Sequence, residues 1–175
     1  LGMMAASVVG FVGLDEVSLE LAASLMRSGH AIQAFQAPLH LMTDFCRLGG
    51  KECTTLNEAT QGVCALVILI SDVDQIHNIF FGSGGVLTGL SRDVIIILHT
   101  TLLPVHTQEL EKSLRENYHM EIIVDLYIVK PMFEVSKGEI VVVSSGQLES
   151  ISRAKPILSA ISERVFICDG DIGSA

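Results

Sequence analysis

The strongest constraint on this chain is the regular alternation of short β-branched apolar runs with amphipathic stretches along its whole length. The amphipathic stretches carry apolar residues three and four positions apart, as Val17, Leu21 and Leu25 do, which predicts helices with one buried face. We expect strands over 7–12, 31–35, 65–70, 94–98, 121–126, 140–143 and 165–167, and helices over 16–27, 40–48, 73–80, 107–118 and 148–160. This order predicts an α/β fold, a doubly wound, mostly parallel sheet of Rossmann type in three α/β/α layers.

Length and composition narrow the class of protein further. With 175 residues the chain has room for one core, so residues 7–175 are expected to form one Rossmann domain after a tag or disordered N-terminus over 1–6. The longest apolar run, residues 63–70, is far below the ~20 residues that span a bilayer. A net charge of −9 argues against nucleic-acid and anionic-membrane partners.

Cysteine and histidine usage predicts no metal site and no disulfide frame. The four cysteines have no CxxC spacing, which indicates thiols in a reducing compartment, so a cytoplasmic location is expected. His99 and His106 have a spacing that suits no helical or hairpin metal pair, and no Cys or Asp completes a site around them.

The segment after the first predicted strand has the position of a dinucleotide-binding turn but only part of its glycine pattern. In the GxGxxG fingerprint the first glycine forms the bend, the second lets a pyrophosphate approach the helix amides, and the third allows close packing. Here these positions are Gly13, Asp15 and Ser18. A carboxylate about 4 Å from a phosphate charge costs roughly 1 kcal/mol in water and about 4 kcal/mol at an effective dielectric near 20. As the N-cap of the next helix, Asp15 would itself occupy the anion position, so both interpretations predict weakened binding.

The end of the second predicted strand offers little to a ribose. Dinucleotide-binding proteins place there an acidic residue for the ribose hydroxyls or, nearby, an Arg for a 2′-phosphate, and Phe35-Gln36-Ala37 carries neither. Gln36 is expected either to give one neutral hydrogen bond or to be an exposed strand-end residue.

Five segments, in order and at matching spacing, resemble the β-hydroxyacid dehydrogenases, the group of 3-hydroxyisobutyrate dehydrogenase and 6-phosphogluconate dehydrogenase: residues 10–14, 28–30, 81–87, 100–104 and 138–146. The resemblance is strongest to the first such domain of large plant proteins that fuse dehydrogenase-like and class II aldolase-like regions. It implies a domain that binds NADP or NAD, with cofactor contacts among Gly10, Gly13, Leu14, Asp15, Gln36, Ser71, Thr100 and Thr101.

The resemblance also implies which functional groups differ or lie elsewhere. The catalytic lysine of the family follows a glycine-rich run that residues 170–175 match only at its start, so no catalytic residue is assigned and these 175 residues alone are expected to be inactive. In the substrate segment Asp125 matches the family, whereas Val129, Lys130 and Pro131 replace a serine and two glycines. Asp125 and Lys130 are the candidate contacts for a small hydroxyacid, and the alternative for Lys130 is a solvated charge.

Two functional hypotheses follow. The first is the N-terminal NAD(P)-binding domain of a 3-hydroxyisobutyrate dehydrogenase-like oxidoreductase with a degenerate fingerprint. The second is a non-catalytic Rossmann module for oligomerisation or regulation in a larger multidomain protein. The retained glycines and threonines favour the first, and Asp15 with the altered substrate segment favours the second. The high apolar content fits a homodimer face or a docking surface for the helical domain that follows in the family.

Overall fold

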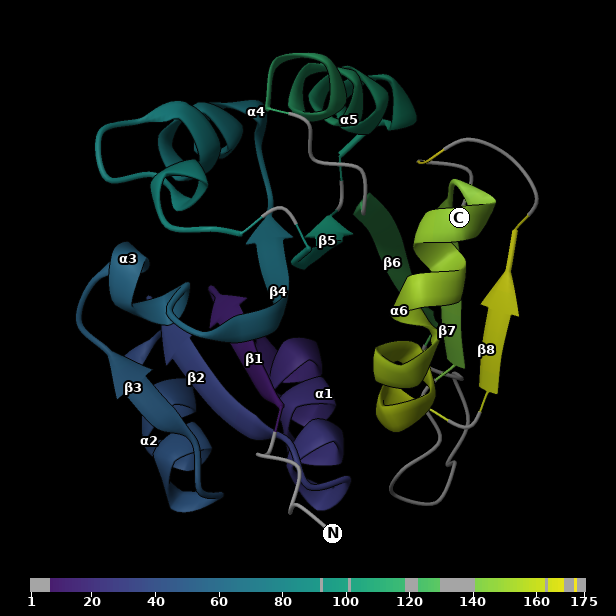
Figure 1. The fold of residues 1–175 in the computed structure, drawn as a ribbon. Helices are drawn as coiled ribbons and strands as arrows, with labels where there is room; N and C mark the ends of the chain where they lie inside the picture. Colours follow the sequence, from purple (N-terminus) through teal and green to yellow (C-terminus); the bar gives the residue numbers. More distant parts are fainter. Residues whose placement is uncertain are drawn as a thin grey trace, which may run out of the picture.

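The computed structural model describes residues 7–91, 93–100, 102–118, 123–129, 141–162, 164–168 and 172. Over these residues eight strands form one sheet in the order β3-β2-β1-β4-β5-β6-β7-β8 (Figure 1). They are β1 (Val8–Val12), β2 (Ala31–Phe35), β3 (Lys51–Cys53), β4 (Val63–Ile70), β5 (Ile95–Thr100), β6 (Ile123–Val129), β7 (Val141–Gly146) and β8 (Arg164–Ile167). Neighbouring strands are parallel except β6 and β7, which are antiparallel. The predicted doubly wound, mostly parallel sheet is confirmed.

Helices cover both faces of the sheet. One face carries α1 (Glu16–Arg27), α2 (Leu39–Arg47) and α6 (Leu148–Ile161). The other carries α3 (Leu56–Ala59), α4 (Val73–Ile76), the π-helical turn η1 (His77–Phe81), the 3-10 turn η2 (Val86–Thr88) and α5 (Pro104–Tyr118). In the part of the chain that the structure describes, no helix is long and apolar enough to cross a membrane.

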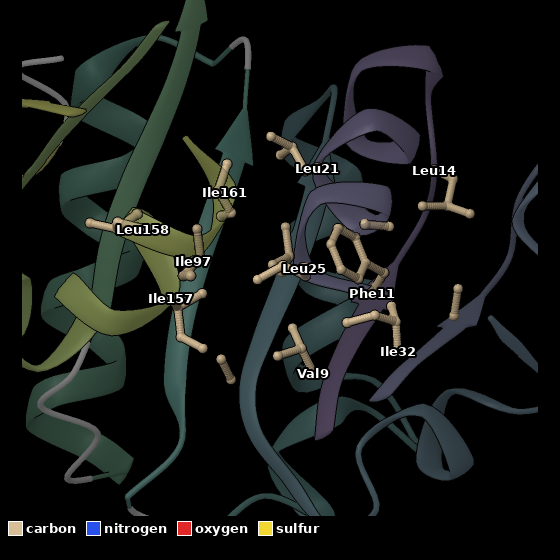
Figure 2. Packing of buried hydrophobic residues seen from close by; sticks show 14 of the residues in the cluster. Val9, Phe11, Leu14, Leu21, Leu25, Ile32, Ile97, Ile157, Leu158 and Ile161 are labelled. Carbon is tan, nitrogen blue, oxygen red and sulfur yellow. The ribbon is translucent and has the colours of Figure 1, made fainter. Parts of the chain in front are cut away.

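The alternation of side chains along β1 divides the core into two halves. Val9 and Phe11 point to the face covered by α1 and α6, where they meet Leu21 and Leu25 of α1 (Figure 2). Val12 belongs to the cluster on the opposite face. Leu21 and Leu25 are fully buried, and each such burial stabilises the fold by roughly 1.5–3 kcal/mol. This packing fixes α1 against the sheet and therefore fixes where its N-terminus lies.

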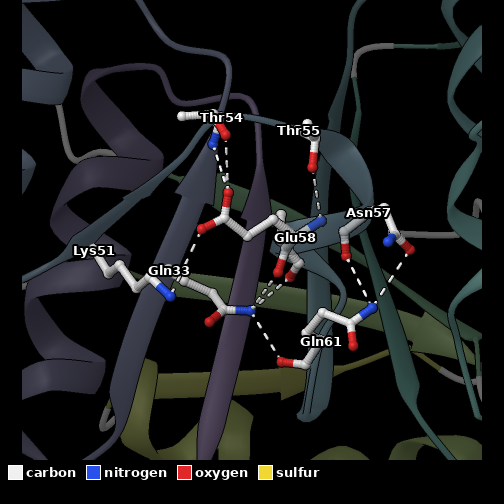
Figure 3. Close-up of polar contacts among 8 residues, drawn as sticks. Gln33, Lys51, Thr54, Thr55, Asn57, Glu58 and Gln61 are labelled. Carbon is white, nitrogen blue, oxygen red and sulfur yellow. Dashed lines mark hydrogen bonds and ion pairs between the residues drawn. The ribbon is translucent and has the colours of Figure 1, made fainter.

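A buried glutamine holds the short helix α3 against the sheet. The Gln33 side chain is 8% exposed, and its Nε2 lies 3.0–3.2 Å from the carbonyl oxygens of Glu58, Ala59 and Gln61 (Figure 3). Thr55 caps the other end by accepting the Glu58 N–H at 3.1 Å, as expected of a threonine N-cap. Side chains therefore satisfy backbone polar groups at both ends of α3.

Gly10 provides the space that this packing needs. A Cβ at this position would lie 2.4 Å from the carbonyl oxygen of Ala59, closer than any side chain tolerates. The residue sits in the middle of β1, before the turn, where it lets α3 approach the strand.

The structure differs from the predicted elements at β3, at α3, over the segment of α4 and η1, and at η2, which was not predicted. β3 and α3 were not predicted, because Lys51-Glu52-Cys53 carries no apolar alternation and α3 has only four residues. The predicted helix over 73–80 is α4 followed by the π-helical turn η1.

The glycines after η1 allow close backbone approach, since a Cβ on Gly85 would lie 2.8 Å from the Phe80 carbonyl oxygen.

Candidate functional site

The first turn connects β1 to α1 at the point where the sheet order reverses, with β2 on one side of β1 and β4 on the other. In open α/β sheets ligands bind at the carboxyl ends of the strands beside this point. Gly13 adopts φ +80°, and its N–H donates to the Phe35 carbonyl oxygen at 2.8 Å. A side chain there would be strained and would press on Leu69, so the bend requires glycine. Leu14, which follows, is buried in the core on the α1 side.

Asp15 is the N-cap of α1, as one of the two interpretations of the sequence predicted. Its Oδ1 accepts the Ser18 N–H at 2.7 Å, and the Asp15 N–H donates to Ser18 Oγ at 2.8 Å, which completes a reciprocal capping box. The Ser18 hydroxyl also donates to Asp15 Oδ1 at 2.8 Å. A carboxylate therefore already lies at the helix end where the amides attract anions.

The second oxygen of this carboxylate faces a histidine from another strand. Asp15 Oδ2 lies 3.4 Å from Nε2 of His99, which is the last residue but one of β5. The His99 side chain is 13% exposed and that of Asp15 is 42% exposed. The hydrogen bond from His99, together with those from Ser18, holds the pKa of the Asp15 carboxyl well below its usual range, although partial burial acts in the opposite direction. Asp15 is therefore ionised at neutral pH, with both oxygens engaged.

His99 has a second ring nitrogen with a different environment. Its Nδ1 is buried and has no hydrogen-bond partner among the residues that the structure describes. A neutral imidazole with its proton on Nε2 fits this arrangement, because the buried Nδ1 then carries a lone pair rather than an unpaired N–H.

Three other candidate contacts also lie at the carboxyl ends of strands. Gln36 follows β2 in the left-handed region, with φ +64°, and is exposed. Ser71 follows β4, is exposed, and donates its backbone N–H to Gln75 Oε1 at 2.8 Å. Thr100 ends β5, and its Oγ1 accepts the Leu102 N–H at 2.9 Å. The structure thus brings side chains from β2, β4 and β5 to the edge of the sheet where the first turn lies.

The remaining predicted residues are placed less fully. Thr101 and Lys130 lie outside the described residues. Asp125 belongs to β6, where its backbone is in register with Leu98 of β5. Gly10 lies against α3 rather than in the turn.

Sequence reasoning missed His99 as a neighbour of Asp15 and considered it only with His106 as a metal pair. The available signal was positional, since His99 lies near the carboxyl end of β5, which only β4 separates from β1, and the carboxyl ends of parallel strands share one edge. Among the described residues no group of three or more His, Cys, Asp or Glu could hold a metal ion. All four cysteines are free, and burial raises the pKa of the Cys53 thiol.

Comparisons with known proteins agree with this fold. Residues 8–170 match the family model described as the NAD binding domain of 6-phosphogluconate dehydrogenase. The chain is 22% identical over 165 residues to 3-sulfolactaldehyde reductase of Escherichia coli (strain K12), which covers 94% of this chain and 54% of the reductase. It therefore spans about half the length of the curated relatives it matches.

Solved structures show the same fold. A 3-hydroxyisobutyrate dehydrogenase from Salmonella typhimurium superimposes with a TM-score of 0.80 at 22% identity, over 96% of this chain and 58% of the dehydrogenase. An imine reductase from Myxococcus stipitatus in complex with NADP+ superimposes with a TM-score of 0.79 at 17% identity, over 95% of this chain and 56% of the reductase.

Proposed function

Since the chain belongs to the family of NAD-binding domains of 6-phosphogluconate dehydrogenase, we propose that it forms the cofactor-binding part of a 3-hydroxyisobutyrate dehydrogenase-like oxidoreductase and binds NAD or NADP weakly. The observation that carries this proposal is the bend at Gly13, which directs the N-terminus of α1 to the switch point of the sheet. The predicted relationship to β-hydroxyacid dehydrogenases is confirmed. The likeness to plant fusion proteins stays a prediction.

The residues at the edge of the sheet fit a dinucleotide in part. The Gly13 bend is retained, and Ser71 and Thr100 offer hydroxyls at the ends of β4 and β5 for the ribose or nicotinamide. Gln36 offers a neutral side chain at the end of β2 for the other ribose. The N–H groups of the first turn of α1 also have no intrahelical partners by position.

The fit is poorest at the pyrophosphate position, where Asp15 takes the Ser18 amide. A bound nicotinamide dinucleotide would supply or accept a hydride, and the residues of this chain would bind and orient it. Because the capping box occupies this position, we expect the dinucleotide to bind weakly. Thr101 near the cofactor and Asp125 with Lys130 near a small hydroxyacid remain proposed contacts.

A second candidate function is a non-catalytic module for oligomerisation or regulation inside a larger protein. The observation that favours it is that both oxygens of the Asp15 carboxylate are engaged, one by Ser18 and one by His99. A carboxylate held from two sides resists displacement by a phosphate. In this case the fold would be retained for its surface, either in a homodimer or against a further helical domain, and light scattering of the isolated chain tests the homodimer.

Calorimetric titration of the chain with NADH and with NADPH separates the two functions. Dissociation constants between micromolar and millimolar for either nucleotide support weak cofactor binding. No measurable heat at millimolar concentrations of both nucleotides supports the non-binding module instead. A variant of the exposed α2 carboxylate, Asp44→Asn, has the same charge change as a variant of Asp15 and should titrate like the wild type.

A further inference from the structure

We propose that His99 is a positioning residue that supplies the countercharge of the first turn, so that a dinucleotide phosphate binds together with the uptake of a proton by His99. This inference rests on the proposed function, because it concerns the same anion position. It goes beyond cofactor binding by assigning a role to His99 and by predicting that binding depends on pH.

The geometry places one ionisable base against one carboxylate. His99 Nε2 lies 3.4 Å from Asp15 Oδ2, while the Ser18 N–H holds Oδ1 at 2.7 Å. The carboxylate is thus shared between the helix end and the imidazole. When His99 is neutral the pair carries a full negative charge at the position where a phosphate must approach, and when His99 is protonated the pair is neutral.

The neighbouring elements carry basic as well as acidic side chains. His99 is flanked in the sheet by Leu69 of β4 and Leu126 of β6. The charged and titratable residues on the elements packed around the pair are Glu16, Glu20 and Arg27 on α1, Cys64 on β4, Asp125 and Tyr127 on β6, and Glu149, Arg153 and Lys155 on α6. Arg27 lies in the last turn of α1, at the end of the helix opposite Asp15. His99 is the base that contacts the carboxylate.

The state of the imidazole is coupled to the anion. In the free chain a second proton on His99 would sit on Nδ1, which is buried and without a partner among the described residues. A phosphate arriving beside Asp15 adds negative charge next to the ring and favours the protonated form. Histidine ordinarily titrates between pH 5 and 8, so the coupling falls in a range that is easily measured.

The experiment is calorimetry of NADH binding at pH 6.0, 7.0 and 8.0, in buffers of different ionisation enthalpy so that the heat reports proton uptake. NADH is the probe because its pyrophosphate does not titrate in this range. The expected result is an affinity that falls as pH rises, by up to about tenfold per pH unit, with a fractional proton taken up at pH 7.

Two variants test the assignment. His99→Gln keeps a donor for Asp15 but cannot gain charge, so its NADH affinity should be independent of pH and close to that of the wild type at pH 8.0. His106→Gln, on α5, removes a histidine that does not contact Asp15 and should keep the wild-type pH slope.

The outcomes are distinguishable. NADH binding that is independent of pH in the wild type, or a His99→Gln variant that keeps the slope, overturns the role of His99 and leaves the proposed function intact. Absence of NADH binding at pH 6.0 as well as at pH 8.0 overturns both, because the protonated pair is the state in which binding is expected.

Discussion

Replacement of Asp15 by glycine should restore the anion position at the N-terminus of α1. Asp15 Oδ1 lies 2.7 Å from the Ser18 nitrogen, so a phosphate oxygen that took over this N–H would place its charge within about 4 Å of the carboxylate. Two negative charges at that distance repel by roughly 1 kcal/mol in water and about 4 kcal/mol at an effective dielectric near 20. Because about 1.4 kcal/mol corresponds to a factor of ten, removal of the carboxylate should tighten binding by roughly 5- to 700-fold.

The cost to the fold should be small. Replacing an aspartate N-cap by glycine destabilises a helix by only a few tenths of a kcal/mol, since water and the exposed backbone satisfy the freed amide. The packing of Leu21 and Leu25 on the sheet is unchanged by the substitution. Asp15→Gly should therefore fold, and urea denaturation checks that it does.

The assay is calorimetric titration with NADH at pH 8.0. Asp15→Asn is the companion variant, because asparagine caps as well as aspartate but carries no charge. An intermediate gain for Asn and a full gain for Gly would divide the effect between charge and occupied space. An Asp15→Gly variant that binds NADH within twofold of the wild type would refute the assignment of Asp15 as the cause of weak binding.

Two further predictions concern stability. Gln33→Leu should lower the free energy of unfolding by about 1–3 kcal/mol, because carbonyl groups at the end of α3 lose their donor. Gln61→Leu, on the exposed side, should change it by less than about 0.5 kcal/mol. Urea denaturation of both variants measures the difference, and equal losses would contradict the anchoring role of Gln33. The depressed pKa of Asp15 makes the ionised form stabilising, so its contribution is present above the ordinary aspartate pKa of about 4 and is lost as pH falls below it. The stability advantage of the wild type over Asp15→Asn should accordingly shrink as pH falls from about 4 toward the lowered pKa of Asp15, and a difference that stays constant down to pH 2 would show that the fold does not lower this pKa.

Periodicity predicted most of the fold because it is a local property. The runs that became β1, β2 and β4 are too apolar to lie at a surface, and the spacing of Val17, Leu21 and Leu25 defines a buried stripe on α1. β3 and α3 escaped prediction because their stability comes from contacts with other elements. Lys51-Glu52-Cys53 is a strand because β2 pairs with it, and α3 is held by Gln33 from β2.

The first turn likewise combines features that the sequence predicts with one contact that only the tertiary structure decides. The bend at Gly13 and the N-cap at Asp15 were predictable from the sequence, because a turn and a cap are decided within about four residues by backbone conformation and hydrogen bonding. The partner of the second carboxylate oxygen was not, because His99 is distant in the chain. Only the order of the sheet, which leaves β4 alone between β1 and β5, brings the imidazole to Asp15 and gives this anion position its charge.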